Sequence, residues 1–90
     1  MSKITQVTNK IAEHFNLTPE QVINKSNKDE IVHPRQIIFY LLRIKYGIIH
    51  KDIQNYFSKN RSTIIHSVRV IGGMMDIDKN LKEYIKRFEL

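Results

Sequence analysis

Apolar residues return every three or four positions along most of this chain, which is the spacing of amphipathic helices. In residues 3–15 the apolar positions predict a helix with one buried face, and Asn16 is expected to end it. Thr18, Pro19 and Gln21 then form the start signal of a short second helix: a capping residue, a proline at the first helical position and a capping-box partner. The apolar positions of these two helices are Ile4, Val7, Ile11, Phe15, Val22 and Ile23.

Residues 24–33 are rich in turn formers and show no helical pattern, so they are predicted to be a loop. Pro34 is predicted to open the next helix, with Arg35 and Gln36 in its first turn, and Gly47 follows as an end signal. A cation is unfavourable in a first turn because of the helix dipole, which hints that Arg35 is there for a ligand. Apolar residues on several sides indicate a central helix: Ile37, Ile38, Leu41, Leu42 and Ile44.

A short helix over residues 51–57, a break at residues 58–60 and a longer helix from Arg61 have the layout of a helix-turn-helix motif, about residues 51–75. Asn60 is the expected cap of the longer helix. Steps of 100° place Ser62, His66, Arg69 and Gly73 on a polar front, with Arg61 and Thr63 at its edges. The same steps place on the buried back Ile64, Ile65, Val68, Ile71, Gly72 and Met75.

The two glycines at positions 72 and 73 are expected to loosen the end of this helix. Residues 76–78 offer a cap for a last helix, whose apolar face closes the core. That face consists of Leu81, Tyr84, Ile85 and Phe88. The chain is therefore predicted to be all-α, with five or six helices in a single domain over residues 1–90.

Composition narrows the class of protein. Ninety residues with 41% hydrophobic content suffice for one small core, and the absence of cysteine excludes disulfides and thiolate metal sites. No apolar run reaches the length of a membrane span, and the first residues do not form a signal peptide. A cytoplasmic protein without membrane contact is the expectation.

The net charge of +6 is concentrated in the middle of the chain. Residues 31–75 hold seven basic residues against Asp52 alone, whereas residues 1–30 and 76–90 are each balanced. A solvated surface would spread its charge more evenly, so the clustering favours a polyanionic partner such as nucleic acid.

Catalytic and metal chemistry have no candidate residues. His14, His33, His50 and His66 match no local metal motif, and His14 is expected to be a partly exposed surface residue. There is no glycine-rich phosphate loop, and no pair of carboxylates lies in an apolar run. We therefore expect no enzyme activity, metal or cofactor.

Two motifs in this sequence resemble the C-terminal DNA-binding domain of the bacterial replication initiator DnaA. The first is Pro34-Arg35-Gln36-Ile37, and the second is the run from Ser62 to Ser67, which is similar to the family signature Gly-Gly-Arg-Asp-His-Thr-Thr-Val-(Leu/Ile)-His-Ala. The resemblance spans essentially the whole chain. It implies a Trp repressor-like helix-turn-helix fold and sequence-specific binding of double-stranded DNA.

The resemblance also assigns residues to the DNA. It places Asn60, Arg61, Ser62 and Thr63 in the major groove, where Arg favours guanine and Asn favours adenine. It carries a DNA contact over to Arg35 and a minor-groove contact to Asn27, beside Lys28. The central charge adds phosphate contacts for Lys51, Lys59, Arg69 and, more weakly, Arg43. His66 is either near the DNA or structural. Ser58 stands where the family has Gly-Gly, so the turn is one residue shorter.

The sequence is compatible with three kinds of role. The role is replication initiation or its regulation, with replication proteins as further partners in the nucleoid, or transcriptional regulation of the Trp repressor type. A basic module that docks on an acidic surface of another protein shares the same charge pattern. Ninety residues leave no room for the initiator's ATPase module, so no ATP site is expected, and the chain is read as a stand-alone domain or an excised fragment.

Overall fold

The computed structural model describes residues 2–24 and 28–90, and the described residues form helices and connections without a β-strand. The helices are α1 (Lys3–His14), α2 (Pro19–Ile23), α3 (Asp29–Tyr40), α4 (His50–Phe57), α5 (Arg61–Ile77) and α6 (Lys79–Arg87). A π-helical turn, η1 (Leu41–Lys45), continues α3. The prediction of an all-α chain with five or six helices is confirmed.

Helix ends at several places follow the start and stop signals of the sequence. Asn16 has φ 58° just after α1, and Gly47 has φ 64° after η1, both in the left-handed region. Thr18 and Gln21 form the predicted capping box: the Gln21 N–H donates to Thr18 Oγ1 at 3.2 Å, and the Thr18 N–H donates to Gln21 Oε1 at 2.8 Å. Asp78 caps α6 by accepting from the Leu81 N–H at 3.1 Å.

The prediction that residues 24–33 are a loop opening at Pro34 is wrong for the second half of that range. Helix α3 begins at Asp29, and Pro34 lies inside it. Asp29 and Glu30 favour the positive end of the helix dipole, and Ile31 and Pro34 are buried three residues apart. Pro34 removes one helical N–H donor without breaking the helix. Arg35 therefore lies in the second turn, and the dipole argument does not apply to it.

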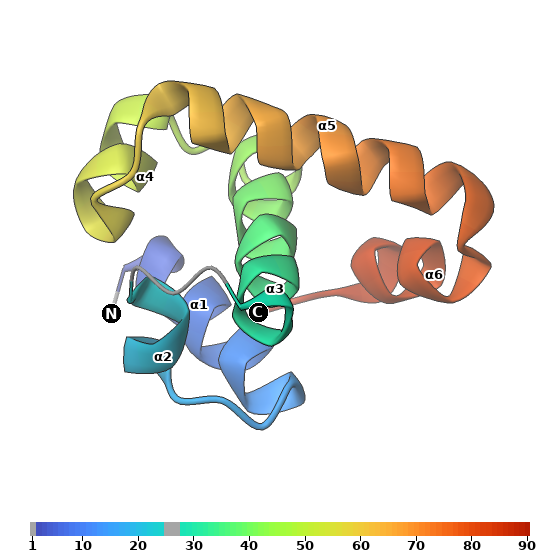
Figure 1. The fold of residues 1–90 in the computed structure, drawn as a ribbon. Helices are drawn as coiled ribbons and strands as arrows, with labels where there is room; N and C mark the ends of the chain where they lie inside the picture. The colour runs from blue at the N-terminus through green and yellow to red at the C-terminus, as the bar shows by residue number, and fades with distance from the viewer. Residues whose placement is uncertain (1, 25–27) are drawn as a thin grey trace.

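The core lies where α3 crosses beneath α5, with α1 and α2 packed against α3 and α6 packed against α5 (Figure 1). Its fully buried large side chains include Ile11, Ile37, Phe39, Leu42, Phe57 and Ile71. Phe39 and Phe57 pack edge to face, with ring centroids 4.9 Å apart, and join α3 to α4. The last helix completes the core as predicted, since Leu81, Ile85 and Phe88 are buried.

Two isoleucines predicted to be apolar packing positions are exposed instead. Ile44 is 57% exposed, because the wider π-turn of η1 rotates it away from the face that α3 buries. Ile65 is 39% exposed, because the buried side of α5 centres on Ile64, Ser67 and Ile71. In the part of the chain that the structure describes, no helix combines the length and apolar character needed to cross a membrane.

Candidate nucleic-acid interface

The connection between α4 and α5 is a tight turn of three residues. Ser58 ends α4 in the left-handed conformation, with φ 53°, and the Lys59 N–H donates to the Gln54 carbonyl at 3.3 Å. Glycine is the usual residue at such a helix end because it has no Cβ. Ser58 takes this conformation in the place where the family signature has glycine, so the chain reverses without one.

Helix α5 begins at Arg61, with Asn60 as its cap residue, as predicted. Asn60 is extended (φ −75°, ψ 153°), and its carbonyl accepts the first helical N–H groups, but its side chain makes no capping hydrogen bond. The side-chain oxygen of an asparagine at this position usually accepts a hydrogen bond from a backbone N–H in the first turn of the helix. The exposed amide of Asn60 is therefore presented at the start of α5.

The front of α5 is polar and exposed along its first half. Ser62, His66 and Arg69 are exposed on the side opposite Ile64 and Ile71, as the periodicity predicts. Arg61 and Thr63 are exposed at the edges. Ile65 adds an apolar side chain to this front, which contradicts its predicted place on the back of the helix.

The back of α5 contains a polar residue that helical periodicity missed. Ser67 is 2% exposed, and its hydroxyl donates to the Thr63 carbonyl at 2.8 Å within the same helix. The hydroxyl is satisfied locally, and the small side chain lets α5 lie close to the core. The spacing of apolar residues does not predict a buried serine, because serine is counted as polar.

Basic residues surround the start of α5. Lys51 is exposed on α4, and Lys59 is half-buried in the turn. Arg43, on η1, is half-buried, and its Nη1 donates to the Ile48 carbonyl at 2.6 Å, just before α4. These residues come from three consecutive segments, so the fold gathers a substantial part of the central charge around the helix-turn-helix.

His50, the first residue of α4, lies within reach of these charges. Its burial lowers its pKa below the ordinary value of 6.5, and the positive charges of Arg43 and Arg61 lower the pKa further. The charges of an arginine on η1 and of another at the start of α5 therefore both act on His50. The sequence alone assigned His50 no role, because it matches no local metal motif.

Arg35 does not belong to this exposed surface. It is 5% exposed, and burial lowers its pKa. Its Nε donates to the Val22 carbonyl at 2.8 Å, and its Nη2 donates to the Asn24 carbonyl. The guanidinium thus holds the end of α2. Lys28 is exposed at the start of α3, and Asn27, the proposed minor-groove residue, lies outside the described residues.

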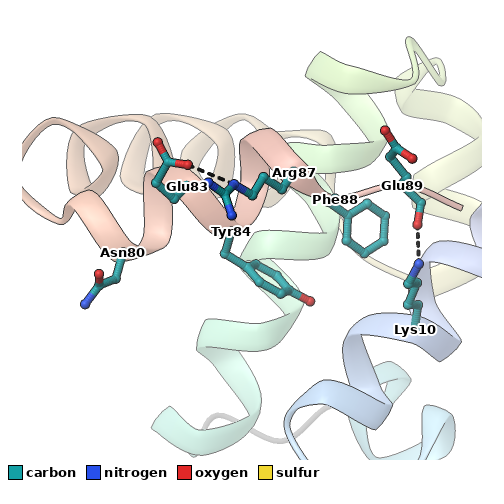
Figure 2. A pocket seen from close by; sticks show the side chains of 7 residues that line it. All are labelled: Lys10, Asn80, Glu83, Tyr84, Arg87, Phe88 and Glu89. Carbon is teal, nitrogen blue, oxygen red and sulfur yellow. Dashed lines mark hydrogen bonds and ion pairs between the residues drawn. The ribbon is translucent and has the colours of Figure 1, made fainter.

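A shallow hollow on the α6 side of the molecule is lined by one ion pair and by a lysine that bonds a backbone carbonyl (Figure 2). Glu83 and Arg87 form an ion pair at 3.1 Å across one turn of α6, and Lys10 of α1 donates to the Glu89 carbonyl. No group of histidine and carboxylate side chains suited to a metal ion occurs among the described residues. The hydrogen bond from Lys10 to Glu89 holds the end of the chain against α1.

The α4–turn–α5 unit, with a buried back and a basic, polar front, makes this a helix-turn-helix domain. The chain belongs to the bacterial DnaA protein helix-turn-helix family, whose match covers residues 4–71. That match takes in the motif through Ile71 of α5 and leaves out α6.

Several curated relatives are chromosomal replication initiator proteins DnaA. The protein from Lacticaseibacillus casei is 35% identical over 83 residues, which cover 91% of this chain and 18% of that protein. DnaA 1 from Chlamydia muridarum is 34% identical over 67 residues, covering 74% and 15% respectively. DnaA from Mycoplasma pneumoniae is 29% identical over 75 residues, covering 83% and 17%. The chain thus spans less than a fifth of the length of these relatives.

Proposed function

We propose that this chain binds double-stranded DNA in a sequence-specific manner, with the front of α5 in the major groove, and that it acts in replication initiation or its regulation. The observation that carries the proposal is the exposed front of α5, where Arg61, Ser62, His66 and Arg69 lie beside an uncommitted cap side chain, Asn60. Membership of the DnaA helix-turn-helix family supports DNA binding, and the names of the relatives support a place in replication initiation.

The proposed roles follow the position of each side chain. Arg61 and Asn60 read base edges, because the first residues of a recognition helix reach deepest into the groove. Ser62 and Thr63 assist them. Lys51, Lys59 and Arg69 contact phosphates from the two sides of the turn, and Arg43, His66 and Lys28 are weaker candidates for such contacts.

Selection of bound sequences from a random duplex pool tests the proposal, and Arg61→Ala tests its central residue. Arginine commonly makes two hydrogen bonds to guanine, so its loss should cost about 1 to 3 kcal/mol on the preferred site and relax preference at one base pair. Fluorescence anisotropy on the preferred and scrambled duplexes measures both effects.

Arg87→Ala is the matched control, since it removes the same charge from α6 on the far side of the molecule. It should leave sequence preference unchanged. An equal loss for Arg61→Ala on every duplex would make Arg61 a phosphate contact. If the unmodified chain bound no duplex even at low salt, DNA binding would be wrong, and the basic surface would be assigned to a protein partner.

A further inference from the structure

One isoleucine interrupts the polar front of α5. Ile65 is 39% exposed, so the packing of the core covers only part of its side chain. The residues three and four positions away are its neighbours on the helix surface. Arg61 and Ser62 lie one turn before it and Arg69 one turn after it, all three exposed, while Val68 is half-buried toward the core. An apolar side chain therefore stands between two arginines on the basic surface.

The side chain of Ile65 is held in a narrow range of conformations. An isoleucine within a helix has one strongly preferred χ1 rotamer, because its Cβ carries two heavy atoms. Ile65 lies inside α5, in the second turn, and not at a frayed end. It loses less freedom than a long charged side chain when a ligand covers it, and removal of its apolar surface from water is favourable. Ile65 is thus suited to a contact with an apolar group.

The major groove of DNA offers one such group. Its base edges present hydrogen-bond donors and acceptors and, on thymine alone, the C5 methyl group. The arginine and serine side chains beside Ile65 can bond the donors and acceptors, but they give no apolar contact. Thr63 also carries a methyl group, at the edge of the front. Ile65 is the more apolar of the two and lies between Arg61 and Arg69.

The spacing along α5 places this contact relative to that of Arg61. Ile65 follows Arg61 by four residues, which is about 6 Å along the helix axis. Successive base pairs are about 3.4 Å apart along the duplex. A side chain one turn beyond Arg61 therefore faces a base pair within about two steps of the one that Arg61 reads.

We propose that Ile65 is a specificity-determining residue, which packs against the C5 methyl group of a thymine within about two base pairs of the base pair read by Arg61. The proposal rests on the proposed duplex binding and adds an apolar contact to the polar ones. It gives a function to the exposed position of Ile65, which the core does not use fully.

Replacement of single thymines by deoxyuridine in the preferred duplex tests the contact, since it removes the methyl group and keeps the base pair and the O4 acceptor. The preferred duplex comes from the selection described above, and Arg61→Ala identifies the base pair that Arg61 reads. For the unmodified chain, uracil at one thymine within two base pairs of that position should weaken binding about fourfold, the effect of one apolar carbon left unburied. Fluorescence anisotropy measures the affinities.

A cycle between the protein and the DNA assigns the methyl group to Ile65. Ile65→Ala should weaken binding to the thymine duplex about threefold to tenfold. Uracil at the sensitive position should then change the affinity of Ile65→Ala by less than about 1.5-fold, because the methyl group has already lost its partner. Ile77→Ala is the matched control: Ile77 is 86% exposed at the other end of α5, and this variant should keep the full uracil effect.

Three results would overturn the proposal. The preferred site has no thymine within two base pairs of the one read by Arg61, or uracil there leaves the affinity of the unmodified chain unchanged. The uracil effect persists in Ile65→Ala, which would assign the methyl group to another side chain such as Thr63. The effect disappears equally in Ile77→Ala, which would exclude a local contact.

A second variant guards against misfolding. If thermal unfolding shows that Ile65→Ala is not folded, the cycle is repeated with Ile65→Gln, which keeps a long side chain and a good helix former but ends in a polar amide. Absence of sequence-specific duplex binding in the unmodified chain would refute the proposed function. Sequence-specific binding that is indifferent to every uracil would refute only the role of Ile65.

Discussion

The pKa of His50 is lowered by burial and by two neighbouring arginines of the basic surface. It is half-buried at the start of α4, and its charge neighbours are Arg43 from η1 and Arg61 from α5, with Lys51 and Asp52 following on its own helix. Burial and the two arginines disfavour the imidazolium form. His50 is therefore more readily neutral in the folded chain than in the unfolded one.

The folded-state pKa of His50 should lie below 6.5, and Arg43→Met should raise it part of the way back, because burial is the larger cause. Its contribution to stability is complete above pH 6.5 and is lost as the pH falls through the folded pKa, since the unfolded chain then binds the additional proton. NMR titration of the His50 ring measures the pKa. Arg87→Met, on α6, should leave it unchanged; an equal shift in that control would exclude a local effect of Arg43.

Helix α5 is continuous through its two glycines, although the sequence predicted that they loosen its end. The helix runs to Ile77, four residues beyond Gly73. A methyl group at Gly73 would meet no atom within 4 Å, while one at Gly72 would touch the Tyr40 ring at 4.0 Å. Helix α5 packs on α3, and these contacts keep it helical at the two glycines. Tertiary contacts thus override a weak local preference.

Gly73→Ala should stabilise the domain by about 0.5 to 1 kcal/mol, because it removes backbone freedom from the unfolded chain in an open helical position. Urea unfolding measures the change. Gly47→Ala is the opposite control: Gly47 has φ 64°, which an alanine adopts at a cost of about 1 kcal/mol, so this variant should be destabilised. Destabilisation by Gly73→Ala would mean that α5 needs flexibility there.

At the scale of the whole molecule, two lysines fasten the last helix to the rest of the fold. Lys45 of η1 donates to the carbonyls of Ile85 and Lys86 at 3.1 and 3.2 Å, and also to that of Phe88. Lys10 of α1 donates to the Glu89 carbonyl, as Figure 2 shows. Cations belong at the negative end of a helix, so these lysines complement the end of α6.

Lys45→Met should destabilise the domain by about 1 kcal/mol, because three carbonyls at the end of α6 lose a charged donor at a partly exposed site. Thermal unfolding measures the loss. Lys82→Met removes the same charge from an exposed position on α6 and should have little effect. Equal losses in the two variants would show that net charge, and not the contact with α6, determines the change.

The candidate surface was partly predictable because each of its parts is encoded by neighbouring residues. Helical periodicity placed Ser62, His66 and Arg69 on the front of α5, and the cap signal placed Asn60 before it; both are confirmed. The predicted DNA contacts themselves stay predictions. Ile65 was misplaced, because the direction of the core is set by the helices that pack on α5 and not by the apolar count of the helix itself.

The sequence by itself determined the local features: the helices over most of their lengths, their caps, the helix-turn-helix spacing and the location of the positive charge. These depend on interactions within a few residues. The tertiary structure decided that Pro34 lies inside a helix, that Arg35 is buried against α2, and that His50 meets Arg43 and Arg61. Those outcomes depend on partners from separate elements, because burial and charge act across space and the spacing of residues along the chain does not contain them.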